Sequence, residues 1–219
     1  LELEHGYFWM MRDLQNTDKK PTLSNTSLIP EHDAQVFPVL KGLTTLTKEA
    51  ADLPFFFVEK HKDPDGPNCT LVSLSFRNSG FEQISTWTEP FSRAFANDPK
   101  VNTFTVSITE RWSLYLLKGF LSNLMRNNTP PEQHDSTLLY FGSDVDEFRD
   151  VLRMHNIMTN YVFLLDEQGC IRFAGSGPAS EEEVANLIGF AKDLTEDSKR
   201  RRSRKAGKKK GRTGAKERQ

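Results

Sequence analysis

The spacing of apolar residues between residues 70 and 196 alternates between strand-like and helix-like periods, and this alternation constrains the fold more than any other feature. Strands are predicted at 70–76, 101–109, 137–141, 161–165 and 170–174. Helices are predicted at 81–97, 111–127, 144–155 and 181–194. Strands that alternate with helices pair in parallel through right-handed crossovers. The segment is therefore predicted to be α/β, with a mixed sheet flanked by helices.

This order of elements, with a hairpin before a closing helix, is that of thioredoxin-like domains, whose redox motif follows the first of these strands. Here that turn, residues 76–82, contains no cysteine, and the chain has only Cys69 and Cys170. A redox thiol needs a thiolate stabilised at a helix N-terminus, usually with a second cysteine close by. Asn160 also stands near the position where such domains carry a cis-proline. We therefore predict a redox-inactive thioredoxin-like domain over residues 51–197 that is not an enzyme.

Basic residues are concentrated at the carboxyl end of the chain. Residues 198–219 contain 12 Lys and Arg and one Glu, whereas residues 1–197 have a net charge of −12. The basic segment has no apolar residues with which to form a core, so 198–219 is predicted to be a disordered tail. Its side chains are expected to contact anionic lipid or ribosomal RNA, or to act only as a solubilising tail. The residues proposed for that contact are Arg200, Arg201, Arg202, Lys208, Lys209 and Lys210.

Other patterns limit the function classes. No apolar run approaches the ~20 residues of a membrane-spanning helix. The cysteines and histidines lack the spacing of metal ligands, and no nucleotide-binding glycine motif is present, so no cofactor is expected. Residues 1–50 contain several prolines and are predicted to be an irregular extension. The chain begins at Leu1 without a methionine, so a missing N-terminal segment with any targeting peptide is expected.

The segments 36–42 and 70–190 resemble the mitochondrial F-type ATP synthase assembly factor known as ATPase complex subunit ten. The most specific part is Asn160–Asp166 followed by Cys170–Ala179, which is similar to the family's GYVYLVD and KIRWAGCG stretches. Asn160 replaces a glycine of that pattern, Phe173 a tryptophan and Ser176 a cysteine. The helix start at 111–117 and the Phe37-Pro38 pair also resemble the family.

The resemblance implies an assembly chaperone at the matrix face of the mitochondrial inner membrane. Such a protein binds the newly made membrane-sector subunit a and promotes its association with the ring of c subunits. It works by binding and needs no cofactor. The resemblance does not cover the first 35 residues or the basic tail.

Three regions are candidates for the surface that binds a partner. The helix at 111–127 has apolar residues around most of its circumference, so either the protein core surrounds it or it receives an apolar client together with residues 6–11. Arg172, beside Phe173, either pairs with a client carboxylate or is an ordinary solvated arginine of a strand. The predicted partner-binding residues are Trp112, Leu116, Phe120, Arg172 and Phe173.

The alternative function is that of an enzyme. A divergent thioredoxin-like peroxidase or thiol oxidoreductase would use Cys170, and its thiolate would have to form near neutral pH. Packing of both cysteines as small, buried residues is the simpler interpretation.

Overall fold

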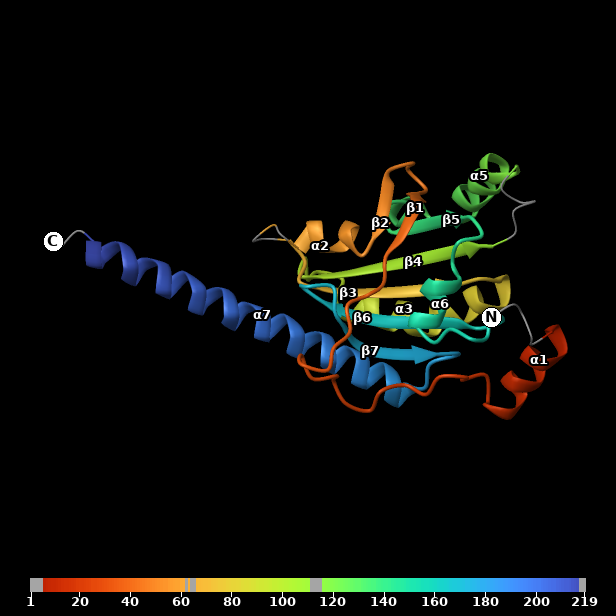
Figure 1. The fold of residues 1–219 in the computed structure, drawn as a ribbon, viewed down its shortest axis with the longest axis horizontal. Coiled ribbons are helices and arrows are strands. Elements are labelled where there is room, and N and C mark those ends of the chain that lie inside the picture. Colours follow the sequence, from red (N-terminus) through yellow and green to blue (C-terminus); the bar gives the residue numbers. More distant parts are fainter. Residues whose placement is uncertain (1–5, 62, 64–65, 111–115, 217–219) are drawn as a thin grey trace.

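The computed structural model describes the chain except for residues 1–5, 62, 64–65, 111–115 and 217–219, and it gives only the backbone for residues 78, 79, 81 and 202–216. Strands form a central sheet with helices on both of its faces (Figure 1). The strands are β1 Leu40–Thr45, β2 Ala50–Leu53, β3 Cys69–Ser75, β4 Val101–Thr109, β5 Thr137–Phe141, β6 Asn160–Asp166 and β7 Ile171–Ser176. The helices are α1 Tyr7–Asn16, α2 Phe55–His61, α3 Asn78–Ala94, α5 Lys118–Asn128, the 3-10 turn η1 Pro131–Gln133, α6 Asp146–Val151 and α7 Glu181–Lys216.

The strand order in the sheet is β2-β1-β5-β4-β3-β6-β7. β3, β4 and β5 run parallel to one another, and β6 runs antiparallel to both β3 and β7. The unit β3-α3-β4 followed later by the hairpin β6-β7 and by α7 is the arrangement of a thioredoxin-like domain. The predicted fold class is therefore confirmed. The hairpin turn has Gly169 in the left-handed region at a φ of 80°, as its sequence predicts.

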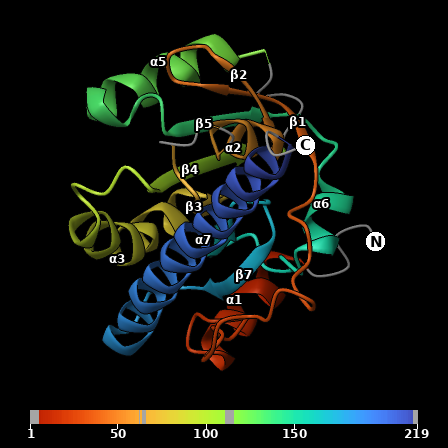
Figure 2. The ribbon, with the colours of Figure 1, turned by 90° about the vertical axis from the view of Figure 1, so that its left-hand side faces the viewer.

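The two largest apolar cores of the described residues lie on the two faces of the sheet because successive side chains of a strand point to opposite faces. In β6, Tyr161 and Phe163 pack into one core, and Val162 and Leu164 pack into the other. The second core is closed by α3 and α7, which lie on the same face and contact each other (Figure 2). The first core is closed by α2, α6 and the chain before β1.

The first 50 residues are more ordered than the sequence indicates. They contain α1 and β1, and β1 pairs with β5 and with β2, so the sheet begins well before residue 51. Residues 22–37 run along β7, where the amide of Ile29 donates to the carbonyl of Arg172 at 2.8 Å. β7 is an edge strand, and its backbone groups need such partners. The prediction of an irregular extension over 1–50 is therefore wrong.

The basic end of the chain continues α7 as far as Lys216, where the sequence predicts disorder from residue 198. The start of α7 matches the predicted cap, because the amide of Glu183 donates to Ser180 Oγ and the amide of Ser180 to Glu183 Oε2. Lys and Arg have high helix propensity, and no proline follows to end the helix. The prediction of disorder rested on composition, which indicates whether a segment can form an apolar core but not whether its backbone is helical.

Candidate partner-binding surfaces

The position of a thioredoxin active site, the turn between β3 and α3, is filled by close backbone packing. A Cβ atom added to Gly80 would lie 2.3 Å from Ser75 Oγ and 3.0 Å from the carbonyl oxygen of Thr159. Gly80 therefore lets the first turn of α3 approach the loop before β6. Both cysteines lie at the other end of the sheet, Cys69 at the start of β3 and Cys170 in the turn between β6 and β7.

Neither thiol has the environment of a reactive cysteine. Both are free. Burial, followed by the charge of Asp166, raises the pKa of the Cys69 thiol above its ordinary value. Burial and then Asp166 also raise the pKa of Cys170, whose side chain is only partly buried. A raised pKa lowers the thiolate fraction at neutral pH, which is opposite to the shift that thiol catalysis requires.

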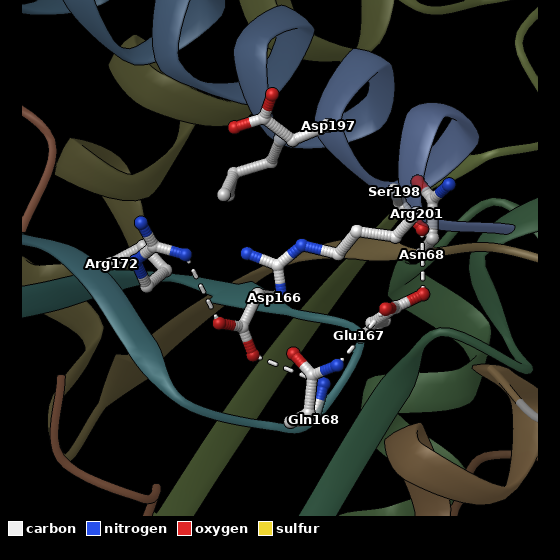
Figure 3. A pocket seen from close by; sticks show the side chains of 9 residues that line it. Asn68, Asp166, Glu167, Gln168, Arg172, Asp197, Ser198 and Arg201 are labelled. Carbon is white, nitrogen blue, oxygen red and sulfur yellow. Dashed lines mark hydrogen bonds and ion pairs between the residues drawn. The ribbon is translucent and has the colours of Figure 1, made fainter. Parts of the chain in front are cut away.

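Arg172 and Phe173, which the sequence suggested as partner-binding residues, are inside the protein. Phe173 is fully buried in the core under α3 and α7 and lies near Trp87. Arg172 is 7% exposed, and its guanidinium pairs with Asp166 at 3.2 Å (Figure 3). Its Nε also donates to the carbonyl of Ile29 at 2.7 Å. The expectation that these two residues form a partner surface is therefore wrong, and Arg172 is a structural cation.

A small polar cluster beside this ion pair holds α7 against the hairpin. Ser198 of α7 donates from Oγ to Glu167 at 2.6 Å, and Arg201 pairs with Glu31 at 2.8 Å (Figure 3 shows Ser198 and Arg201). Glu167 belongs to the β6-β7 turn and Glu31 to the segment that runs along β7. Two separate parts of the body thus anchor the helix at the point where its basic part begins.

The apolar helix that the sequence places at 111–127 is described from Lys118, and Trp112 lies outside the described residues. Leu121 and Met125 pack on Leu139 and Phe141 of the sheet. Large apolar side chains of α5 and of the two residues before it are exposed by roughly half or more: Leu116 83%, Leu117 50%, Phe120 67% and Leu124 48%. α5 is therefore not enclosed by the core, and the placement of Leu116 and Phe120 fits a partner surface.

α1 presents a second apolar surface. Met10 is buried, and Asn156 donates from Nδ2 to the carbonyl of Met10 at 2.9 Å, which anchors the helix to the loop before β6. The side chains of Tyr7 and Phe8 are 57% and 87% exposed, and Trp9 is 39% exposed. α1 and α5 both lie toward the end of the sheet at which β4 ends, and they are near opposite edges of the sheet (Figures 1 and 2).

The basic part of α7 lies at the other end of the molecule and projects beyond the sheet (Figure 1). Arg200 is exposed and pairs with Glu196 and Asp197 on its own helix, whereas Arg201 pairs with Glu31. Arg202, Lys208, Lys209 and Lys210 have helical backbone in α7. The six residues proposed for contact with lipid or RNA are therefore well separated from the apolar helices.

Over the part of the chain that the structure describes, no helix combines the length and apolarity needed to cross a membrane. No group of three side chains suited to hold a metal ion occurs among those same residues.

Comparison with solved structures finds thioredoxin-like proteins at low identity. The thioredoxin domain of a thiol-disulfide oxidoreductase from Bacteroides vulgatus is 15% identical, with a TM-score of 0.44, and the match covers 72% of this chain and 96% of that one. A DsbF homologue from Corynebacterium diphtheriae is 9% identical, with a TM-score of 0.46, and the match covers 79% and 94%. Comparison with curated proteins gives no match.

A family model is more informative. The model described as ATP10 protein matches residues 1–194, which includes α1, the segment along β7 and the whole sheet. The resemblance seen in 36–42 and 70–190 thus extends to the beginning of the chain, and the basic end lies outside the match. On this match the chain belongs to the ATP10 protein family, the family of assembly factors for the mitochondrial ATP synthase.

Proposed function

We propose that this chain holds the apolar membrane-sector subunit a of the ATP synthase at the matrix face of the mitochondrial inner membrane until it joins the ring of c subunits. Membership of the ATP10 family supports the choice of complex. The observation that carries the proposal is helix α1, whose large apolar side chains Tyr7 and Phe8 are more than half exposed.

Exposure of this kind is costly for a protein that works alone. Burying one Phe or Leu side chain contributes about 1.5–3 kcal/mol, so the exposed Phe8 could stabilise a complex by an amount of that order. Contiguous exposed apolar side chains mark sites for a partner or a membrane. A subunit rich in membrane-spanning helices offers the apolar surface that would cover them.

The proposed mechanism is binding without a reaction. The turn that carries the chemistry in thioredoxins has no cysteine here, and burial raises the pKa of Cys170. The rigid sheet then serves to position α1 through the contact of Asn156 with Met10. Release would follow when the ring of c subunits covers the same surface of the client.

The test is co-purification of subunit a with the tagged chain from gently solubilised mitochondria. The variant Phe8→Ser with Trp9→Ser is expected to lower the recovery of subunit a severalfold. Leu23→Ser is the matched control, because Leu23 is 82% exposed and belongs to the segment that runs along β7, outside α1. Loss of subunit a in the control alone, or undiminished recovery with the α1 variant, would contradict the assignment of this surface.

A further inference from the structure

A groove between α5 and β1 carries a concentration of positive charge. Its volume is about 350 Å³, and its lining includes the side chains of Lys48, Lys118 and Arg126. The remaining lining residues are neutral: Thr44, Thr45, Leu46, Gly119, Ser122 and Asn123. Among the residues that the structure describes, no carboxylate lines the groove. The nearby Asp135 accepts a hydrogen bond from Thr47 at 2.7 Å, and neither residue is part of the lining.

The three cations come from two elements that the fold brings together. Lys48 lies in the turn between β1 and β2, where its φ is 71°. Lys118 begins α5, and Arg126 follows two turns later on the side of the helix that also carries Ser122. Lys118 lies with its ammonium 5.9 Å from the ring centre of Phe141. β1 and α5 both contact β5 or its flanking residues, which explains why the groove forms between them.

The exposed apolar side chains of α5 lie on the flank of the helix away from the groove. The residues of α5 fall into three stripes: Leu121 and Met125 face the sheet, Lys118 and Arg126 face the groove, and Phe120 and Leu124 face solvent. Residues two apart in a helix point to nearly opposite sides, so the cationic groove lies on one flank of the sheet-facing stripe and the exposed apolar stripe lies on the other. An amphipathic helix with basic residues on one face and large apolar residues on the other is typical of segments that lie in the interface of a bilayer.

The charge of this region differs from that of the surrounding body. Residues 111–128 contain Arg111, Lys118 and Arg126 and no Asp or Glu. Over residues 1–197 acidic residues outnumber basic ones by 12, so the groove is a positive area on an acidic domain. An acidic body is repelled by an anionic surface unless it approaches through such an area.

We infer that α5 docks on an anionic bilayer, with the phosphate of a lipid headgroup in the groove of Lys48, Lys118 and Arg126 and with Leu116, Phe120 and Leu124 among the upper acyl chains. A free phosphate ion would satisfy the groove but leave the apolar stripe in water. An apolar protein segment would cover the stripe but leave the cations without a counterion. An anionic phospholipid layer satisfies both at once. The inference rests on the proposed function only for the presence of a membrane, and it leaves α1 to contact the client.

The test is flotation of the full chain with phosphatidylcholine vesicles that contain or lack cardiolipin. Two basic residues near an anionic surface correspond to about a thirtyfold change in partition coefficient, so Lys118→Gln with Arg126→Gln is expected to lower binding to cardiolipin vesicles by about that factor. Leu116→Ser with Phe120→Ser is expected to lower binding as well. These side chains are exposed or half-buried, in α5 or just before it, so the melting temperature should stay unchanged and serves as the folding check.

The basic part of α7 provides the matched control. Lys209→Gln with Lys210→Gln removes the same charge far from α5 and is expected to leave most of the vesicle binding intact. Loss of binding in this control, with the α5 variants unaffected, would overturn the inference and assign the lipid contact to α7. Retained vesicle binding but lost subunit a in the α5 variants would overturn it too, since α5 would then be a client surface. The vesicles contain no protein, so the flotation result tests the lipid contact even if the chain does not bind subunit a.

Discussion

Replacement of Arg172 by methionine separates a structural role of this residue from a role in partner binding. Arg172 and Asp166 are 7% and 5% exposed, and their charged groups lie 3.2 Å apart. Methionine has a similar length and no charge, so Arg172→Met removes one partner of a buried ion pair with little change in packing volume. Breaking a buried pair in this way costs about 3–5 kcal/mol, because the other charge stays buried without compensation.

The contacts of Asp166 place the expected loss at the lower end of that range. Asp166 Oδ1 still accepts from the amides of Gln168 and Cys170, each at 3.0 Å, so the carboxylate keeps two donors. The carbonyl of Ile29 loses the Nε donor at 2.7 Å. We expect a decrease of about 3 kcal/mol in the free energy of unfolding. For a domain of this size this corresponds to a drop of roughly 6–12 °C in melting temperature.

Urea unfolding followed by circular dichroism measures the change in free energy, with the slope of the transition as a check on two-state behaviour. The second variant, Arg172→Met with Asp166→Asn, removes the buried charge and should recover part of the loss. A decrease below about 1 kcal/mol for Arg172→Met would refute the structural role. If such a stable variant also lost subunit a, Arg172 would be a client contact as the sequence first suggested.

Three further predictions concern other parts of the molecule. Gly80→Ala is expected to destabilise the fold by about 1–3 kcal/mol in urea unfolding, because the added methyl group meets Ser75 Oγ and the backbone of Thr159; unchanged stability would contradict that packing. The raised pKa of Cys170 predicts alkylation by iodoacetamide that is slower in the folded than in the unfolded chain at neutral pH and accelerates as the pH rises, so fast reaction near neutral pH would revive the peroxidase hypothesis. Truncation after Arg201 keeps the contact with Glu31 and is expected to weaken binding to a fluorescent RNA, measured by anisotropy with a steep salt dependence; equal affinity of both chains would count against an RNA contact.

The sequence predicted the central part of the fold because the local signals there agree with the packing. β3 and β6 read as short runs of β-branched, apolar and small residues, and the structure buries them along their whole length. The turn at Gly169 and the cap at Ser180 each depend on one residue type at one position, and both formed as predicted. Signals of this kind need no information about distant parts of the chain.

The errors share a physical cause, which is dependence on contacts far away in the sequence. Residues 22–37 look irregular because their hydrogen bonds are made to β7, about 140 residues later. Arg172 looks like an ordinary strand arginine, and only the approach of Asp166 across the β6-β7 turn shows that it is buried. A pattern within one segment cannot reveal such partners.

Sequence patterns were also insufficient to identify the candidate partner-binding surfaces. The sequence singled out Leu116 and Phe120 for their apolarity, but that property is equally expected of a core helix. In the structure Leu121 and Met125 occupy the side of α5 toward the sheet, and Leu116 and Phe120 are exposed. The sequence did not indicate a role for Lys48, because Lys48 and Lys118 line the same groove only through the pairing of β1 with β5.

The positions of the apolar and basic regions have a consequence for how the chain is oriented. α1 and α5 lie at one end of the sheet, and the basic part of α7 leaves the other end (Figure 1). If α5 docks on the membrane as we propose, α7 points into the aqueous compartment. The helix has almost no apolar residues after Leu194, so it lacks a face that would enter a bilayer. Of the two partners expected for the basic residues, a polyanion in solution such as RNA then fits the geometry better than the membrane that α5 contacts.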